Sequence, residues 1–588
     1  MVLTIDIETR AKKEGVINPD TDYLVVVGVK KDDGPCEYYY RNDWWKLKHR
    51  LSRDDSPIVG HNLKGFDLVV LKRYGFEFEG KIIIDTLDIL KFKNRARAMM
   101  YMDLEDKGGF SLANCCKVFG LTALKDEEFD YSVLMEKDLS ESQVEYINEY
   151  LKHDLEASYA LFKHLHDTFI GIKDFMNRKD QEEYKWLTTS PGVCAYKVVC
   201  HQAGLREDYD DGVHVDYPGA YVHLPSTEEA HDHVYSFDFK SLYPHCMMML
   251  NVFERARGVD DAIQNFGGYK PKGRYSKSRF GKVSQVLALM FDLKDEYERK
   301  GDKAGRLATK IVLNTMYGLL GNPAFKSVFD PVAAEDVTQL GQYFTREAIK
   351  MFEDAGLRVL YGDTDSVYLQ DPFGDEQRLF LMCREYSSLM NSHTPFPQKT
   401  FELALEERIR DIYFFQEKGV FKKKFYLFVN TDGEMTVKGL PIKKRDRCKL
   451  SKLVFERLKP KIIEKRTARF PVEVIDSLVK HNFKDARLAG RSLYVKPLSE
   501  YKSESCIQAQ ASKKWGPGKH LIVPVVKGDY NGLEIGKGSM YLRIEDFISM
   551  DTSISSVRLG HVFKDLAYFV TGGKDVKDGK TRVDSSVR

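Results

Sequence analysis

Acidic residues recur along the N-terminal third of the chain at positions that could bind metal ions. Asp6 and Glu8 lie two residues apart in VLTIDIE, an apolar stretch that predicts a strand, so both side chains project from one face. Unpaired charge on such a face is expensive because the carboxylates lose their hydration. Asp67 follows in HNLKGFD, and Asp154 follows in YLKHD, four residues after Tyr150 on one face of an expected helix.

Four carboxylates and a tyrosine suit the hydrolysis of a phosphodiester. Two divalent ions about 4 Å apart, bridged by such acids, can activate water and stabilise the leaving oxygen. Tyr150 could orient that water. Each piece alone indicates little, since a DxE pair is more often an edge or turn feature and YxxxD is usually surface decoration. Their order and the expected elements together favour a nuclease site.

A second acidic set lies in the middle of the chain. Asp238 ends a strand in DFKSLYP, while Asp363 and Asp365 flank a threonine in YGDTDS. The apolar runs RVLYG and SVYL around YGDTDS predict a hairpin with acids at its tip. Nucleotidyl transfer uses two Mg²⁺ ions clamped by carboxylates from separate strands. DTDS alone is typical of an ordinary polar turn, but DFKSLYP upstream favours the catalytic interpretation.

A row of polar side chains follows on one expected helix. Lys310, Asn314 and Tyr317 occur in KIVLNTMYG at spacings of four and three, and Arg306 lies one turn earlier. Such a row suits a triphosphate and a base pair, with cations neutralising developing charge. A solvated amphipathic helix would explain the cations but not the Asn and Tyr beside Gly318.

In this order, the motifs resemble those of compact, phage-type family B DNA polymerases that carry an N-terminal 3′→5′ proofreading exonuclease. The first set resembles the three exonuclease motifs of a domain with an RNase H-like fold. KxxxNxxYG is close to the family's motif B, and the resemblance covers about residues 1–446. It implies Mg²⁺ as cofactor, two ions per active site, with Mn²⁺ able to substitute.

The resemblance also assigns roles to individual residues. The implied metal ligands are Asp6, Glu8, Asp67 and Asp154 in the exonuclease, and Asp238, the Phe239 carbonyl, Asp363 and Asp365 in the polymerase. The implied nucleotide-binding residues are Leu242, Tyr243, Arg306, Lys310, Asn314 and Tyr317. The implied DNA-binding residues are Thr9, His61, Asn62, Phe66, Ser111, Leu112, Tyr217, Gly219, Lys424 and Tyr426.

The resemblance implies four further details. The catalytic set comprises both groups of acids with Tyr150 and Lys310. The ring of Tyr243 would lie under the incoming sugar and exclude a 2′-OH. Tyr217, Gly219 and Ala220 in YPGAYV resemble a YxG(G/A) motif that influences primer traffic between the two active sites. Lys125, in LKDEEFDY, resembles the catalytic lysine of the phage branch, although the hydrophobic residue after it comes one position late.

The elements that must position these residues predict a multidomain protein of α/β and α+β class. VLTIDI, YLVVVGV and KIIIDTLDIL read as strands and Glu141 to His166 as a helix. We expect an RNase H-like exonuclease followed by a right-hand polymerase. The expected domains are the exonuclease (1–170), a connecting region with the YxGA motif (171–234), the palm (235–283 and 323–446), a fingers helical hairpin (284–322), a mostly helical, basic thumb (447–571) and a disordered tail (572–588).

Composition sets the remaining limits. The chain has 588 residues and a net charge of +2, so affinity for nucleic acid must come from local basic patches such as KGVFKKK at Lys418 to Lys424 and KKRDR at Lys443 to Arg447. No run reaches the roughly 20 apolar residues of a membrane helix, and no targeting signal precedes VLTIDI. Nine cysteines without a CxxC pair predict reduced thiols.

The predicted function is DNA-templated DNA synthesis with 3′→5′ exonucleolytic proofreading, in phage or mobile-element replication. The expected partners are primer-template DNA, dNTPs and, in a replisome, a processivity factor, helicase or single-strand binding protein. We expect the protein to act as a monomer that does not associate with a membrane. We expect it in the cytoplasm, which is that of the host if the protein is phage-encoded. One alternative is a 3′→5′ DNA exonuclease with a non-catalytic, DNA-binding polymerase-like half. A non-catalytic scaffold would predict gaps in the acid sets, and neither set has one.

Overall fold

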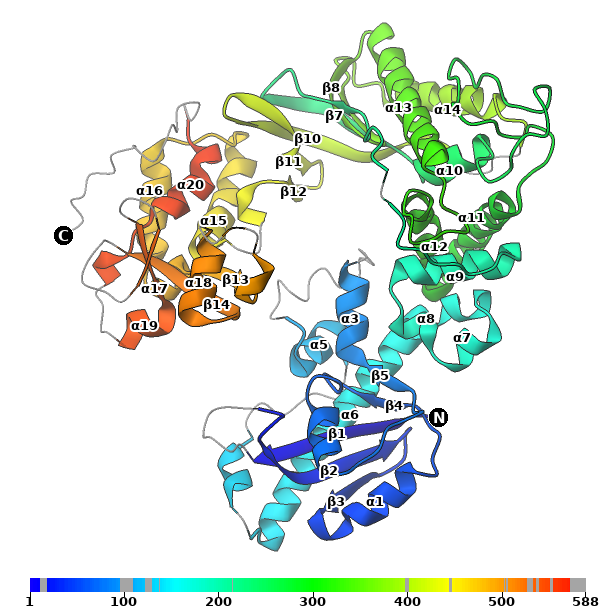
Figure 1. The fold of residues 1–588 in the computed structure, drawn as a ribbon. Coiled ribbons are helices and arrows are strands. Elements are labelled where there is room, and N and C mark those ends of the chain that lie inside the picture. The colour runs from blue at the N-terminus through cyan, green and yellow to red at the C-terminus, as the bar shows by residue number, and fades with distance from the viewer. Residues whose placement is uncertain are drawn as a thin grey trace. The chain divides into compact units, whose positions relative to one another are not determined.

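A computed structural model describes residues 1–10, 18–95, 109–121, 129–136, 138–213, 215–396, 401–443, 447–501, 503, 506–525, 532–535, 539–549 and 554–571. The chain forms two compact units whose parts are coloured along the sequence in Figure 1. The first unit comprises Met1–Gly219, Ser241–Leu340 and Leu389–Phe401, and the second comprises Ala220–Lys240, Gly341–Ser388 and Glu402–Arg588. Each unit therefore combines segments that are distant in the sequence.

A five-stranded sheet organises the N-terminal part of the first unit, with the order β3-β2-β1-β4-β5. Its strands are β1 (Leu3–Arg10), β2 (Tyr23–Lys31), β3 (Cys36–Tyr40), β4 (Ile58–Gly60) and β5 (Ile83–Asp85). β1 pairs antiparallel with β2 and parallel with β4, and β4 pairs parallel with β5. Ile5 and Ile7 enter one hydrophobic core. Because side chains alternate along a strand, Asp6 and Glu8 face the opposite side.

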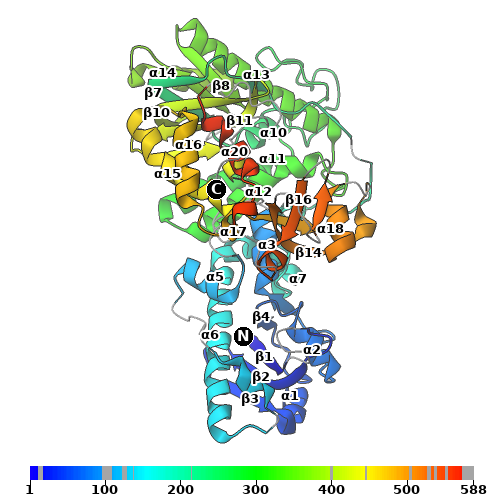
Figure 2. The same ribbon diagram turned by 90° about the vertical axis from the view of Figure 1, so that its left-hand side faces the viewer.

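Helices accompany this sheet. They are α1 (Trp44–Leu51), α2 (Asp67–Arg73), α3 (Thr86–Arg95), α5 (Leu112–Phe119) and α6 (Glu141–Phe169). α6 contacts β1, β2 and β4, and both ribbon views show it as a long helix beside the strands (Figure 1, Figure 2). It begins where Ser140 and Gln143 form a capping box, in which each side-chain oxygen accepts the backbone N–H of the other residue. The helix expected from Glu141 onward is therefore present.

The rest of the first unit is mainly helical. Its helices include α7 (Arg178–Glu182), α8 (Lys185–Thr188), α9 (Pro191–Ala203), α10 (Leu242–Met249), α11 (Lys282–Lys300) and α12 (Lys303–Leu320). α11 ends at Gly301, whose φ of +69° closes the helix, and α12 starts after Asp302, which accepts the N–H of Gly305. The predicted helical hairpin is thus α11 and α12, which pack on each other, and α12 also packs on α9.

A seven-stranded sheet with the order β12-β11-β10-β7-β9-β8-β6 forms the centre of the second unit, and every neighbouring pair in it is antiparallel. Its strands are β6 (Val222–His223), β7 (Glu229–Phe239), β8 (Arg358–Asp363), β9 (Ser366–Gln370), β10 (Leu403–Glu417), β11 (Val420–Asn430) and β12 (Met435–Lys438). The expected hairpin around YGDTDS is β8 and β9. Two further helices border these strands in the sequence, α13 (Pro331–Asp354) and α14 (Glu376–Ser392).

The C-terminal region, predicted as a mostly helical thumb, contains helices and also a sheet that the sequence did not predict. It contains the helices α15 (Lys449–Lys465), α16 (Val472–Asn482), α17 (Ala486–Ala489), α18 (Ile507–Trp515), α19 (Ile544–Ser549) and α20 (Gly560–Leu566). It also contains a four-stranded sheet of order β13-β14-β16-β15, made of β13 (Arg491–Val495), β14 (Gly518–Val525), β16 (Ser539–Arg543) and β15 (Leu533–Ile535). The strands are short, and two of the three pairings join distant segments, so local periodicity did not reveal them. The predicted tail, 572–588, lies outside the described residues.

Two expectations from composition can be compared with the structure. The nine cysteines form no disulfide, and all except Cys36 and Cys506 are buried. Burial raises the pKa of several thiols, including Cys115 and Cys383, each to about 12. Among the helices that the structure describes, none is long and apolar enough to cross a membrane.

Candidate active sites

Three carboxylates converge at the first candidate site. Asp6 and Glu8 on β1 and Asp154 on α6 each offer one oxygen, and these atoms all lie within 4.8 Å of one another. Glu8 and Asp154 are buried, and Asp6 is partly buried. Such closely spaced carboxylates repel one another unless a cation lies between them, so their chemistry fits a divalent metal ion. Within the described ranges, no other group of three or more His, Cys, Asp or Glu side chains is as tight.

A glycine on β2 allows α6 to approach the sheet at this point. Gly28 is the partner of Asp6 in the β1–β2 pairing. A Cβ on Gly28 would lie 2.8 Å from side-chain atoms of both Leu151 and Leu155, which are fully buried on α6. Asp154 lies between these leucines in the sequence. The close packing of α6 at Gly28 therefore carries Asp154 to the carboxylates of β1.

Asp67, the fourth predicted ligand, is not part of the group of three. It is the first residue of α2 and is 5% exposed. Burial raises the pKa of Asp67 well above its ordinary value, and the charges of Asp85 and Glu8 raise it further. Asp67 thus lies in the field of Glu8, and without a cation it favours its protonated form. A bound cation would favour the carboxylate.

Asp85 organises the loop that leads to Asp67, a role that the sequence did not reveal. Its Oδ1 accepts the backbone N–H of Asn62 at 3.0 Å and of Leu87 at 2.9 Å, and its Oδ2 accepts that of Lys64 at 2.9 Å. Asp85 is 2% exposed, so these charge-assisted hydrogen bonds are made away from water. The acid at the end of the apolar run KIIID was the available signal.

His61 is held by the protein itself. Its Nδ1 lies 2.9 Å from Thr86 Oγ1 and its Nε2 lies 2.7 Å from the carbonyl oxygen of Phe110. The ring therefore ties β4, α3 and the segment before α5 together. The implied contact of His61 with DNA stays a prediction, beside this structural role.

The other predicted primer-binding residues lie on β1 or at the starts of α2 and α5. Thr9 follows a register shift in β1, and Phe66 precedes α2. Ser111 caps α5 through its side chain, and Leu112 is the first residue of that helix. Lys125 lies outside the described residues.

Tyr150 is held by two aromatic neighbours. Its ring stacks on that of Phe129 with the centroids 3.9 Å apart, and its hydroxyl lies 2.8 Å from the hydroxyl of Tyr131. Burial, followed by the charge of Asp154, raises the pKa of Tyr150. The hydroxyl therefore stays neutral and can take part in hydrogen bonds beside the carboxylates. Tyr131 was not recognised from the sequence.

The second candidate site lies at one end of the seven-stranded sheet. Asp238 on β7 and Asp363 on β8 both pair with Ser366 of β9. Asp365 occupies the turn between β8 and β9, where its carbonyl oxygen accepts the N–H of Phe239 at 2.8 Å. The strand register therefore brings the three predicted acids together. The side-chain spacing of these described acids is looser than that of the first site.

Two of these acids have strongly raised pKa values. Burial raises the pKa of Asp238 to about 8, and the charges of Asp365 and Glu406 add to the effect. Burial raises the pKa of Asp365 to about 6, with the charge of Asp363 adding and that of Lys424 opposing. Such accumulated negative charge fits the binding of divalent cations, the chemistry that the sequence predicted for these positions.

Glu406 adds a carboxylate that the sequence analysis missed. It lies on β10 where the pairing with β7 shifts register between Leu405 and Glu407. An extra residue of this kind re-aims a side chain, and such bulges are common beside active sites. The charge of Glu406 contributes to the raised pKa values of both Asp238 and Asp365. Strand register, which the sequence does not give, decides this placement.

The predicted DNA-binding residues on β11 have different surroundings. Lys424 Nζ lies 3.7 Å from Asp363, whose carboxylate also accepts hydrogen bonds from the hydroxyl of Tyr361 at 3.1 Å and of Thr364 at 2.9 Å. Tyr426 is 5% exposed, and its hydroxyl lies 2.9 Å from that of Tyr368, in the core of the sheet. Lys424 therefore lies beside Asp363 of the second candidate site, whereas Tyr426 packs in the core of the seven-stranded sheet.

In the first unit, the two tyrosines predicted to meet the nucleotide stack on each other. The ring centroids of Tyr243 and Tyr317 are 4.4 Å apart with 25° between the planes, and the Tyr317 hydroxyl lies 2.6 Å from Thr338 Oγ1. Leu242 and Tyr243 are the first residues of α10. The backbone N–H groups at a helix start have no partner within the helix and suit a phosphate.

The predicted cations on α12 form a cluster with a further lysine. Burial lowers the pKa of Lys310, and the charges of Arg306 and of Lys294 on α11 lower it further. Arg306 also lies 3.6 Å from Glu298, and Asn314 is exposed one turn after Lys310. The cluster concentrates positive charge on the helical hairpin, which fits an anionic ligand. Lys294 was not singled out from the sequence.

The YxGA motif lies where the chain passes from one unit to the other. Gly219 ends a segment of the first unit, and Ala220 begins the second. The ring of Tyr217 meets that of Tyr317 edge-on, with the centroids 6.5 Å apart, and a Cβ on Gly321 would lie 2.2 Å from the Tyr217 hydroxyl. Tyr217 is thus fixed against the end of α12.

Comparison with known proteins agrees with these observations. Residues 282–545 match the model of DNA polymerase family B. The chain is 24% identical over 504 residues to a DNA polymerase of Archaeoglobus fulgidus, covering 79% of this chain and 60% of that protein. It is 31% identical over 315 residues to DNA polymerase 1 of Saccharolobus solfataricus, covering 49% of this chain and 34% of that protein. It is 28% identical over 301 residues to DNA polymerase II of Escherichia coli, covering 48% of this chain and 38% of that protein.

The fold is also similar to a solved structure. The family B DNA polymerase from Pyrobaculum calidifontis matches 97% of this chain and 78% of its own chain, with a TM-score of 0.59 and 19% sequence identity. The resemblance to the family B DNA polymerases that the motifs predicted is confirmed by the family model and the sequence relatives, and the solved structure agrees in fold. The chain spans at most 60% of the length of the three sequence relatives named above, which come from two archaea and a bacterium.

Proposed function

We propose that this protein is a DNA-templated DNA polymerase that extends a primer 3′-OH with dNTPs and removes mispaired ends with its own 3′→5′ exonuclease. The observation that carries the proposal is the presence of two separate carboxylate sets, one in each unit: the first on β1 and α6, the second on β7, β8 and the turn after β8. The family kinship supports DNA as the substrate.

In the proposed polymerase site, Asp238, Asp363 and Asp365, with the Phe239 carbonyl, would hold two Mg²⁺ ions. Bound ions lower the pKa of the primer hydroxyl and neutralise charge on the triphosphate. The amides at the start of α10 would hold phosphate oxygens, and Lys310 would neutralise the charge that develops during transfer. Lys424, beside Asp363, would meet the primer end.

In the proposed exonuclease site, Asp6, Glu8, Asp67 and Asp154 would hold a second pair of ions. Tyr150 would orient the attacking water through its neutral hydroxyl, which Tyr131 and Phe129 hold in place. Asp85 would act on the reaction only by holding the loop before Asp67. Asp85 is therefore a positioning residue.

Sugar selection would rest on Tyr243. Its stacking on Tyr317, which is itself hydrogen bonded to Thr338, limits the movement of the ring. A ring held in this way can reject a nucleotide that carries one extra hydroxyl by steric exclusion.

Further parts of the proposal concern the setting. We propose Mg²⁺ as the cofactor, replaceable by Mn²⁺, and action as a monomer in the cytoplasm during phage or mobile-element replication. A processivity factor, a helicase or a single-strand binding protein would assist.

The test is a labelled primer annealed to a longer template and incubated with the protein and Mg²⁺. We expect extension to the template end with four dNTPs and shortening of the primer without them. A primer with a mispaired 3′ end should be shortened first and then extended. Absence of template-dependent extension by folded protein would overturn the polymerase assignment.

A 3′→5′ exonuclease with a non-catalytic polymerase-like half is the second candidate. The observation in its favour is that the first carboxylate set is tight and the second looser. This candidate predicts primer shortening at the same rate with and without dNTPs, so the same assay separates the two.

A further inference from the structure

Residues 254–282 connect α10 to α11 and carry an unusual concentration of positive charge. The segment contains eight Lys or Arg residues and three Asp or Glu residues, whereas the whole chain has a net charge of only +2. The rest of the chain is therefore net negative. A local excess of this size produces a positive potential that attracts polyanions even when the protein is nearly neutral.

Two of the three acidic residues of this segment form ion pairs or hydrogen bonds with other residues of the same segment. Glu254 pairs with Arg279 at 2.8 Å, and Asp261 accepts hydrogen bonds from the Ser276 hydroxyl at 2.9 Å and the Arg257 backbone N–H at 3.0 Å. By contrast, four exposed cations of the loop before Lys282 have no carboxylate within 4.0 Å among the residues that the structure describes. They are Arg257, Lys270, Arg274 and Lys277.

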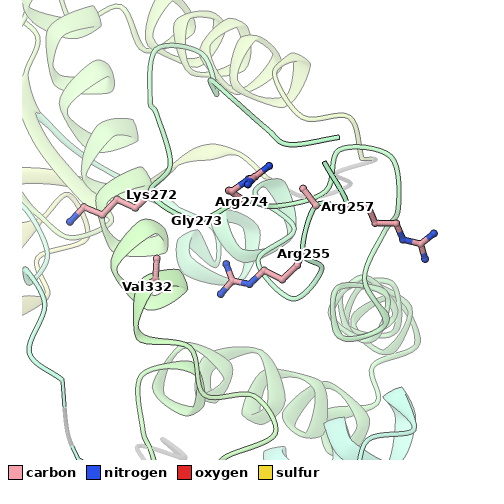
Figure 3. Close-up of a pocket in the computed structure, with 7 residues that line it drawn as sticks. Arg255, Arg257, Lys272, Gly273, Arg274 and Val332 are labelled. Carbon is pink, nitrogen blue, oxygen red and sulfur yellow. The ribbon is translucent and has the colours of Figure 1, made fainter. Parts of the chain in front are cut away.

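Part of the segment surrounds a cavity of about 460 Å³. Its lining includes Arg255, Arg257, Lys272 and Arg274, together with Val332 at the start of α13. Figure 3 shows that Lys272 and Arg257 point in opposite directions, so the cations spread along the surface. Arg255 pairs with Asp330, and Lys272 pairs with Glu335 at 2.5 Å.

A buried aspartate holds the basic loop in one conformation. Asp336 is fully buried on α13, and its carboxylate accepts hydrogen bonds from the hydroxyls of Tyr269 at 2.8 Å and Tyr275 at 2.7 Å. It also accepts the backbone N–H groups of Lys272 and Gly273, both at 2.8 Å. Binding of a ligand to this loop would therefore cost little conformational entropy, because the loop is already ordered.

We propose that residues 254–282 form a binding surface for the phosphate backbone of a DNA strand, with Arg257 and Arg274 as its principal contacts. Cations spread along a rigid surface match the repeating phosphates of a strand better than a single small anion. The inference rests on the proposed function only in taking DNA as the polyanion.

The test measures binding of a labelled single-stranded oligonucleotide and a labelled duplex at rising salt, in EDTA so that neither probe is degraded. The variant is Arg257→Gln with Arg274→Gln. A plot of the logarithm of the DNA-binding constant against the logarithm of salt concentration has a negative slope. Loss of two phosphate contacts should make this slope less steep by about 1.4 on the single strand. The matched control, Arg178→Gln with Lys179→Gln, removes two exposed charges from α7, so its slope should equal that of the parent.

A second variant tests the loop itself. Asp336→Asn removes the charge that holds Tyr269 and Tyr275, so DNA affinity should fall about threefold or more while Arg257 and Arg274 remain. An unchanged slope for the double arginine variant would overturn the proposal. So would competition by inorganic tripolyphosphate as strong as that by DNA at equal phosphate, which would indicate a small-anion site. The two proposals can fail separately. If the parent protein fails to extend primers but the double arginine variant shows the reduced salt dependence of DNA binding, the proposed function is wrong and this inference stands.

Discussion

The two carboxylate regions differ in how the fold assembles them. On β1 and α6, helix-on-sheet packing at Gly28 brings three carboxylates within 4.8 Å. On β7, β8 and β9, strand register gathers the acids more loosely, and Lys424 lies beside one of them. The first arrangement offers three protein carboxylates to one cation. The second leaves space for ligand oxygens from a triphosphate, which is the expected division between a nuclease site and a polymerase site.

Among residues that only support or border the two sites, Asp85 should give the largest effect, and it supports only the first region. Asp85→Asn removes the charge that holds the N–H groups of Asn62, Leu87 and Lys64. Loss of a supporting group of this kind reduces metal affinity or activity about 10- to 100-fold. We expect single-strand degradation to fall by this factor in a gel assay, with raised Mg²⁺ restoring part of it. Primer extension by the same preparation is the control. An equal fall in both activities would contradict a local role.

The next effect belongs to nucleotide selection, which only the polymerase reaction requires. Tyr243→Ala should raise ribonucleotide use relative to deoxynucleotide use about 10-fold or more, because the ring that excludes the 2′-OH is gone. The ratio of kcat/KM for the two nucleotides measures it. Tyr243→Phe keeps the ring stacked on Tyr317 and is the matched control, with selection expected to stay near that of the parent. If Tyr243→Ala rejects ribonucleotides as the parent does, Tyr243 is not the selecting residue.

The smallest effect is on stability and sharpens the electrostatic difference. The pKa of Asp238 is raised to about 8, so the folded state favours the protonated acid. Its stability contribution is full below the unfolded pKa and is lost as pH rises toward 8. Asp238→Asn should therefore stabilise the metal-free protein, by about 2 kcal/mol more at pH 8 than at pH 5.

Thermal unfolding in EDTA at the two pH values measures this gain. Saturating Mg²⁺ should stabilise the parent more than Asp238→Asn and so reduce the difference. A variant that is less stable than the parent at pH 8 would contradict the raised pKa as the source of the effect.

The sequence predicted those parts of the fold and sites that depend on local spacing. The alternation along β1 placed Asp6 and Glu8 on one face, and the period of α6 placed Tyr150 and Asp154 together. Asp85 and Glu406 were missed because their roles depend on which segments meet in space, through a loop and a β-bulge. The four-stranded sheet of the C-terminal region was missed because its strands are short and two of its three pairings, β13–β14 and β14–β16, join distant segments.

Tyr426 illustrates a further limit. The residue lies in KKKFYLF, and the family resemblance implies that it contacts DNA, but Tyr426 is buried on β11 and its hydroxyl meets Tyr368. Burial of a given strand position depends on sheet packing and not on the motif that contains it.

The central claim is that two independent sites carry two activities, and reciprocal variants test it most directly. Asp6→Ala with Glu8→Ala and, separately, Asp365→Ala are assayed for both primer extension and single-strand degradation. The account predicts that the first variant loses degradation at least about 1,000-fold and keeps extension, while Asp365→Ala does the reverse. Loss of both activities in either folded variant would contradict the separation of the two sites.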